Sequence, residues 1–322
     1  MRVNARERTG WRLARMMMIA GQVLLSGCRP EVPGLQIAEV ISIPAAEATT
    51  LHVDRDGRLW LGEETAVSVL DGGEVVARTA IAPGDAPRVV GETNSSLLMR
   101  RGTTAILMFD PASGELLAET AITGEPLLDV RGRWVFVAAG SGAVLMHEPD
   151  SLVLISAWAS LGMASTALAA SPEGDRIYHA LSDDDGAASI LTRDLQTGRT
   201  LRTSVFSAPF VHLATDRQGN LVGVVGGEDD AAVISLRPWG QELELRWRAR
   251  ISSSAMATRI HLSPDGGRAA VLTPGDTKTG LLLLDGETGR SIGQLPEHPL
   301  DARFDSSGRL LLLFPSEIRV VR

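Results

Sequence analysis

A pattern of short apolar segments and turns recurs every 40 residues or so, at about the length that repeat proteins use, from Thr50 onward. Each copy reads as four strands, a short one and three that follow it, joined by an Asp/Pro/Gly turn, a polar loop and a Gly-rich turn. The last copy ends at residues 317–322, one strand short, and an unmatched apolar segment at 35–43 precedes the first copy. A closed ring of four-stranded units, in which the N-terminal segment completes the last unit, accounts for both features.

The turns support strands throughout the repeats. Asp, Ser and Pro open such turns, and Gly takes the positive-φ position that strains other residues. The first turn recurs at 54–57, 171–174, 216–219, 263–266 and 305–308, and the second at 110–114, 194–198 and 285–289. About seven copies of four strands, with no helical stretch between them, select a propeller from among the repeat architectures. The sequence therefore predicts an all-β, seven-bladed β-propeller whose last blade is closed by the N-terminal strand, which leaves no free sheet edges.

The turns also carry a family resemblance. The Ser263-Pro264-Asp265-Gly266 turn and the Asp-x-x-Thr-Gly turn that ends at Gly289 resemble those of bacterial YVTN-type and lactonase-like seven-bladed propellers. The resemblance covers residues 35–322. Such families include enzymes, extracytoplasmic binding proteins and assembly factors. The resemblance thus implies the fold, and function has to be argued from a site.

The N-terminus resembles a bacterial lipoprotein leader. An apolar run at 16–25 follows an arginine-rich segment and is far shorter than the roughly 20 residues that span a bilayer. It ends in Leu25-Ser26-Gly27-Cys28, which resembles the lipoprotein box in which the cysteine takes a diacylglycerol and becomes the first mature residue. Cys28 is the only cysteine. We expect a signal peptide at 1–27, a lipidated Cys28 and tether at 28–34, and a propeller at 35–322.

This resemblance implies a location. Two or more acyl chains anchor a protein stably, so the membrane is an expected partner through the lipid on Cys28. Arg29, not Asp, follows the cysteine. In Gram-negative lipoproteins of this type that residue implies the outer membrane, with the ring facing the periplasm. We therefore expect a monomer in the cell envelope, outside the cytoplasm.

Composition excludes some functions. The formal charge is −8, and removal of the leader's arginines makes the mature chain more acidic. Nucleic-acid binding needs a basic stripe, so no nucleic-acid partner is expected. Aromatic residues are only 4%, which counts against sugar or nucleobase stacking platforms. A single cysteine allows no intrachain disulfide, so stability must come from apolar burial.

Three histidines fall on the first strands of their units, which line the central channel of a propeller. His52 and His261 occupy one repeat position, and His212 lies two residues before it, on the same strand face. With Arg303 they form a candidate polar channel lining that binds a metal or an anion. The alternative is that these are ordinary hydrogen-bonded or solvated histidines. His52 and His261 are two blades apart, which is far for shared metal ligation, and no metal site is predicted.

Acidic residues recur in the loop between the second and third strands. The acidic candidates are Asp183, Asp184, Asp185, Glu228, Asp229 and Asp230, with Glu63-Glu64 and Asp276 at equivalent places. Arg100-Arg101 stands there in the second unit. Equivalent loops lie on one face of a propeller. Three interpretations remain: solvated hairpin turns, a charged partner surface, or a calcium site built from carboxylates.

No Gly-x-Ser-x-Gly elbow, phosphate loop or Cys-x-x-Cys motif is present. Two function hypotheses follow. The first is a non-enzymatic binding or scaffold module for an unknown protein or small molecule. The second is a lactonase-like hydrolase acting on a small molecule at the channel mouth, which requires an acid or base to converge there, with a metal as its expected companion. No cofactor is predicted. A quinone-dependent propeller is disfavoured because the tryptophans do not recur at one repeat position.

Overall fold

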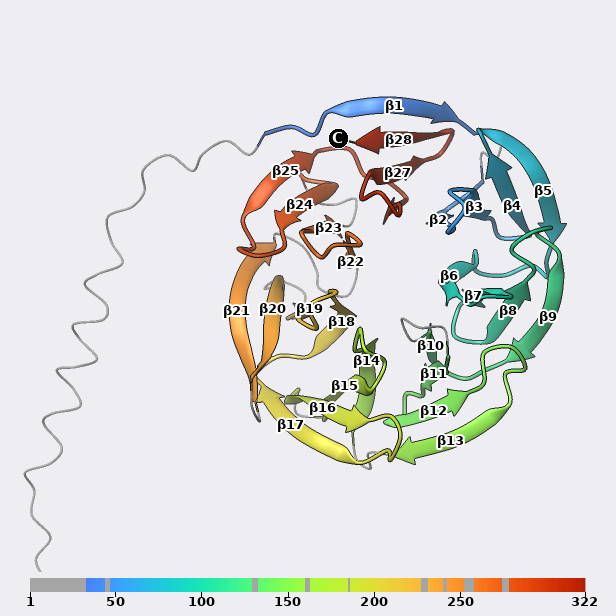
Figure 1. Cartoon of the computed structure of the whole chain (residues 1–322). Helices are drawn as coiled ribbons and strands as arrows, with labels where there is room; N and C mark the ends of the chain where they lie inside the picture. Colours follow the sequence, from blue (N-terminus) through green and yellow to red (C-terminus); the bar gives the residue numbers. More distant parts are fainter. Residues whose placement is uncertain are drawn as a thin grey trace, which may run out of the picture. The chain divides into compact units, whose positions relative to one another are not determined.

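The computed structural model describes residues 33–43, 47–128, 133–159, 163–184, 186–226, 231–239, 242–251, 258–273 and 278–321. From Gly34 onward they form seven antiparallel sheets of four strands, arranged as the blades of a ring (Figure 1). The predicted all-β, seven-bladed propeller is confirmed. The predicted signal peptide at 1–27, Cys28 and most of the tether lie outside the described residues. No helix in the described part of the chain has the length and apolar character to cross a membrane.

The blades follow one another in sequence order, and each runs from the centre of the ring to its rim. The innermost strands are β2 (Thr50–Val53), β6 (Arg88–Glu92), β10 (Glu125–Leu128), β14 (Ala164–Ala170), β18 (Phe210–Thr215), β22 (Arg259–Leu262) and β26 (Asp301–Phe304). The second strands are β3 (Leu59–Gly62), β7 (Leu97–Arg101), β11 (Val135–Ala138), β15 (Arg176–Ser182), β19 (Leu221–Val225), β23 (Arg268–Leu272) and β27 (Leu310–Phe314).

The third strands are β4 (Ala66–Asp71), β8 (Ala105–Phe109), β12 (Ala143–His147), β16 (Ala188–Asp194), β20 (Ala231–Trp239), β24 (Leu281–Asp285) and β28 (Glu317–Val321). The outermost strands are β5 (Glu74–Ala80), β9 (Leu116–Ala121), β13 (Leu154–Ala159), β17 (Thr200–Phe206), β21 (Glu242–Ile251), β25 (Ser291–Leu295) and, in blade seven, the N-terminal β1 (Ile37–Ser42).

The ring closes in blade seven, as the sequence predicts. β1 pairs antiparallel with β28, with Ile41 opposite Ile318 and Val40 opposite Arg319 (Figure 1). Most side chains of β1 are exposed. Val40 is 53% exposed, whereas Ile43, just after the strand, is only 6% exposed. The physical reason is that β1 is the edge strand of its blade. It pairs with β28 on one side, and its other side lies at the rim of the ring, where side chains meet solvent.

The core lies between blades. One apolar cluster combines Leu51, Leu61 and Leu70 of blade one with Leu313 and Ile318 of blade seven. Other clusters likewise join neighbouring blades, such as blades five and six. The second and third strands are therefore buried on both faces, which explains why they read as continuous apolar runs and not as alternating patterns.

In blades one, five and seven the first turn is held by its opening side chain. Asp54 Oδ1 accepts hydrogen bonds from the backbone N–H groups of Asp56 and Arg58, at 3.0 and 2.9 Å. Asp216 and Asp305 make the same pair of contacts in their own turns. Such Asx turns are the expected role of Asp at the start of a turn.

The glycines of the second turn do more than permit positive φ. A Cβ on Gly289 (φ 68°) would lie 2.5 Å from the indole of Trp247 on β21, and one on Gly198 would lie 2.0 Å from Trp158 on β13. Trp247 Nε1 also donates to the carbonyl of Gly286 at 2.9 Å. These turns thus pack against the outermost strand of the preceding blade. Trp247 pairs with Ser235, next to the β-bulge of its blade, whereas Trp158 pairs with Val144, two residues beyond the equivalent place, so the two indoles stand at different repeat positions.

Candidate functional site: an arginine-lined central cavity

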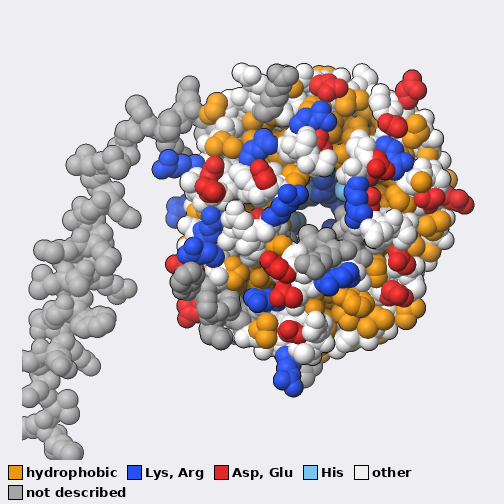
Figure 2. Space-filling model, in the orientation of Figure 1, with side chains coloured by type: hydrophobic (Ala, Val, Ile, Leu, Met, Phe, Trp, Pro, Cys, Tyr) orange, Lys and Arg blue, Asp and Glu red, His pale blue; other side chains and the backbone are white. Residues whose placement is uncertain are grey.

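A cavity of about 450 Å³ lies where the innermost strands of six blades, β6 to β26, converge. Figure 2 shows the opening at the centre of the ring with Lys and Arg side chains around it. Its polar lining residues are Arg88, Arg100, Glu125, Ser165, Thr166, His212, Thr258, Arg259, His261 and Arg303. The volume falls in the range of small-molecule sites, roughly 300–1,000 Å³.

The topology gathers charge at one end of this cavity. All innermost strands run in the same direction along the ring axis, because each blade repeats the same up-and-down order. Arg88, Glu125 and Arg259 are the first residues of β6, β10 and β22. The loops between second and third strands lie at this same end. Arg100, near the end of β7, therefore reaches the cavity beside them.

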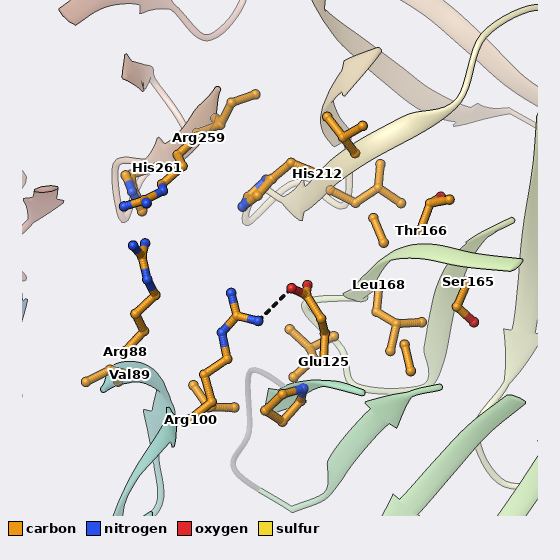
Figure 3. A pocket seen from close by; sticks show the side chains of 18 of the residues that line it. Arg88, Val89, Arg100, Glu125, Ser165, Thr166, Leu168, His212, Arg259 and His261 are labelled. Atoms are coloured by element: carbon orange, nitrogen blue, oxygen red, sulfur yellow. Dashed lines mark hydrogen bonds and ion pairs between the residues drawn. The ribbon is translucent and has the colours of Figure 1, made fainter. Parts of the chain in front are cut away.

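Among the residues that the structure describes, the cavity lining contains four arginines and one carboxylate, that of Glu125. Arg100 Nη1 donates to Glu125 Oε1 at 2.7 Å (Figure 3). Arg88 and Arg259 make no hydrogen bond or salt bridge with the residues that the structure describes, and Figure 3 shows both side chains pointing into the cavity. The wall thus has an excess of positive charge inside a chain whose net charge is −8.

Burial and mutual repulsion act on these guanidinium groups. Burial, and then the like charge of Arg259, lower the pKa of Arg88 to about 10, against a smaller opposing effect of Asp301. Burial also lowers the pKa of Arg259 below its usual value. Both groups remain charged at neutral pH. Burial is the first cause of both shifts, and the carboxylate of Asp301 opposes both of them.

Arg303 is held by the wall. Its Nε donates to the Leu51 carbonyl at 2.9 Å, its Nη1 donates to His261 Nδ1, and its Nη2 lies 3.7 Å from Asp301 Oδ2. Burial, and then Arg303, hold the pKa of His261 well below its usual value. His261 is therefore neutral, and its 3.6 Å approach to Asp301 is not an ion pair.

The structure brings together three of the four predicted channel residues. His212, His261 and Arg303 line the cavity, and burial lowers the pKa of His212 to about 4. His52, on β2, lies outside this lining, and its pKa is lowered to about 3 by burial and then by Arg303.

Sequence reasoning missed Arg88, Arg259 and Glu125, and it noted Arg100 as a loop residue on one face of the ring but not as part of the cavity, so its site set was incomplete by these four residues. Three of them stand at the first residue of a first strand, so the strand-position argument that selected His212 would also have selected them. Arg100 lies on a second strand, where nothing in the repeat pattern distinguishes it from a solvated loop residue.

The acidic loops are described only in part. Asp183 Oδ1 accepts from the Ala187 N–H at 2.8 Å, within its own hairpin, and Asp184 is exposed. Asp185, Glu228, Asp229 and Asp230 lie outside the described residues. The calcium and partner-surface interpretations therefore stay predictions. In the parts of the chain that the structure describes, no group of three or more His, Cys, Asp or Glu side chains is arranged to hold a metal ion.

The equivalent residue in blade one has a structural role. Glu63 is buried, accepts from Ser68 Oγ at 2.8 Å, and pairs with Arg78 Nη2 at 2.6 Å. Its carboxylate ties the β3–β4 loop to the outermost strand. A ligand role is not needed to explain its charge.

The fold and the cavity define a seven-bladed β-propeller that is structurally similar to the WD40 propellers. The β-propeller domain of Cps50 (Swd1) from Myceliophteria thermophila superimposes with a TM-score of 0.70 at 13% identity, covering 89% of this chain and 99% of that one. A chain of the mitotic checkpoint complex gives a TM-score of 0.69 at 14% identity, covering 92% of this chain and 95% of that one. No family model and no curated protein matches the sequence. At these identities the likeness shows the fold alone.

Proposed function

We propose that this chain is a non-enzymatic binding module, held at a membrane by a lipid on Cys28, that receives a small ligand in the central cavity of its propeller. The observation that carries the proposal is the cavity itself. It is open, of small-molecule size, and lined by polar side chains from the innermost strands of six blades. Because the strands on which they stand are rigid elements of a closed ring, these side chains are preorganised for binding.

The chemistry of the lining favours binding over hydrolysis. A hydrolase needs a base or metal-ligating group free to act on the substrate. Glu125 accepts from Arg100, and the Nδ1 atom of His261 accepts from Arg303. These contacts orient the two groups as parts of the wall. A lactonase-like activity is the alternative that the repeat resemblance suggests. Turnover of small lactones that is lost in His212→Ala would establish it in place of binding.

The binding proposal is tested with the purified chain and a panel of neutral, cationic and anionic small molecules. A ligand that binds only the folded state raises the melting temperature, because the stabilisation grows with the logarithm of its concentration over Kd. We expect at least one class to raise the melting temperature, and a calorimetric titration of that class to saturate. A flat response to every class would contradict a small-molecule site in the ring.

The anchor is proposed from the lipoprotein resemblance at Leu25-Ser26-Gly27-Cys28. We expect mass spectrometry of the native protein to find an N-terminal peptide that starts at a diacylated Cys28. Cys28→Ala should move the protein from the membrane to the soluble fraction or leave residues 1–27 uncleaved. An unmodified Cys28 within an intact leader would overturn the anchor. In a Gram-negative cell the expected fraction is the outer membrane, with the ring in the periplasm.

A further inference from the structure

The arginines of the cavity differ in whether a carboxylate or carbonyl oxygen lies near their guanidinium group. Arg100 has a carboxylate partner in Glu125, at 2.7 Å. Arg303 is anchored by the Leu51 carbonyl and lies near Asp301. Arg88 and Arg259 have no such partner among the described residues, although both are half-buried. A buried charge without a partner is costly, so these two positions are where a bound anion would gain most.

The surroundings strengthen that attraction. Apolar residues of the same strands, Val89 and Val90 on β6 and Ile260 on β22, line the cavity beside the two guanidinium groups. In such a low-dielectric wall a charge pair is worth more than in water. The lowered pKa values of Arg88 and Arg259 have the same origin, namely burial and the repulsion of neighbouring arginines, and an anion between them would offset both.

The residues present also define the ligand's chemistry. A guanidinium is a planar fork of donors that matches the paired oxygens of a carboxylate or phosphate. Two unpaired guanidinium groups, from blades two and six, call for at least two negative charges on the ligand. The neutral rings of His212 and His261 bring hydrogen-bonding nitrogens without further charge. A volume of about 450 Å³ restricts the ligand to a compact molecule.

We infer that the central cavity binds a compact organic polyanion, with two or more carboxylate or phosphate groups, between the side chains of Arg88 and Arg259. The inference rests on the proposed binding function and names the chemical class of its ligand.

The test uses the full chain, purified in a non-ionic detergent, with inorganic phosphate, succinate and citrate as probes at an ionic strength held constant with sodium chloride. We expect a melting temperature that rises with probe concentration and a saturable, one-site calorimetric titration. Charge-assisted hydrogen bonds contribute enough that Arg88→Gln and Arg259→Gln should each raise Kd by about 10-fold or more. The control Arg290→Gln removes the same charge from an exposed turn and should change Kd less than about 2-fold.

Glu125→Gln supplies an effect of opposite sign. Glu125 competes with the ligand for Arg100, so removing its charge should tighten binding. The control Glu287→Gln, on an exposed turn, should leave Kd unchanged. Because Arg88→Gln and Arg259→Gln each remove an unpaired positive charge, both variants should melt no lower than the parent without ligand, which separates lost binding from lost folding.

The outcomes discriminate. A response to citrate and succinate alone identifies a polycarboxylate ligand, and a response to phosphate identifies a phosphorylated one. Either supports the inference if it is lost in Arg88→Gln and kept in Arg290→Gln. The inference is overturned if no probe gives a response above the chloride control, or if Arg88→Gln and the control Arg290→Gln weaken binding equally. In that case a neutral or cationic binder from the panel would leave the proposed function standing, whereas no binder of any class would overturn both.

Discussion

Buried histidines are neutral at several places in the ring. Burial lowers the pKa of His52 to about 3 and the pKa values of His179 and His212 to about 4. His179 is almost fully buried, and its Nε2 shares a 2.7 Å hydrogen bond with Ser165 Oγ. In the unfolded chain these rings take up a proton near pH 6.5. The folded chain does not, so acid favours unfolding.

This linkage predicts how stability depends on pH. Between pH 6.5 and about 4 the unfolded state binds more protons than the folded state, so the free energy of unfolding falls as pH falls. Each such histidine contributes a slope of up to about 1.4 kcal/mol per pH unit, and nothing above pH 7. His179→Gln should reduce the slope by about that amount between pH 6.5 and 5, measured by urea unfolding. An unchanged slope would mean that His179 is protonated in the fold.

Substitution of two glycines distinguishes the cost of backbone strain from the cost of a lost contact between blades. Gly57 (φ 85°) has open space where a Cβ would lie, whereas Gly289 (φ 68°) faces Trp247. Gly57→Ala should cost about 1–2 kcal/mol, the penalty of the left-handed region alone. Gly289→Ala should cost about 1–3 kcal/mol more, because the methyl group displaces the indole. Equal losses in denaturant unfolding would show that the indole moves aside freely.

At the scale of the element, β1 closes the last blade mainly through its backbone ladder and through the residue that follows it. Ile43 packs with Leu51, Leu61 and Ile318 in the cluster between blades seven and one, while Val40 faces solvent. The apolar contribution of the closing segment is therefore concentrated at its C-terminal end.

A matched pair of truncations tests this. Ile43→Ala should lower the free energy of unfolding by about 2–5 kcal/mol, as large-to-small changes in cores do. Val40→Ala should change it by less than about 0.5 kcal/mol, as exposed substitutions do. If Val40→Ala proved the more damaging of the two, the packing of β1 described above would be wrong.

At the scale of the whole ring, blades seven and one are joined at the inner wall as well as at the rim. Asp301, fully buried on β26, accepts from the Leu51 N–H at 3.0 Å, and Arg303 donates to the Leu51 carbonyl. The ring is thus fastened by side chains at its centre, where blade seven meets blade one.

Asp301→Ala should break the contact between blades seven and one at the inner wall. It removes the acceptor for Leu51 and leaves Arg303 without its carboxylate beside other arginines, so we expect a loss of about 3–5 kcal/mol in thermal or denaturant unfolding. The control Asp56→Ala removes a carboxylate that is 80% exposed and should cost less than about 1 kcal/mol. A loss no greater than that of the control would mean that the rim strand alone closes the ring.

The candidate site was predictable in part. The repeat position of His212 and His261 placed them on innermost strands, and Arg303 followed by the same argument. The pairing of Arg100 with Glu125 was not predictable, since it joins a second strand of blade two to a first strand of blade three. Nor was the unpaired state of Arg88 and Arg259, because whether a charge has a partner depends on the distances across the ring.

The sequence by itself determined the architecture, because turn chemistry and apolar runs are local and recur with the period of one blade, and because one missing and one spare strand require closure. Only the tertiary structure decided which face of β1 is buried, which tryptophans meet which turn glycines, and which arginines share the cavity. These depend on contacts between blades, where residues far apart in sequence meet, and a one-dimensional repeat carries no record of those distances.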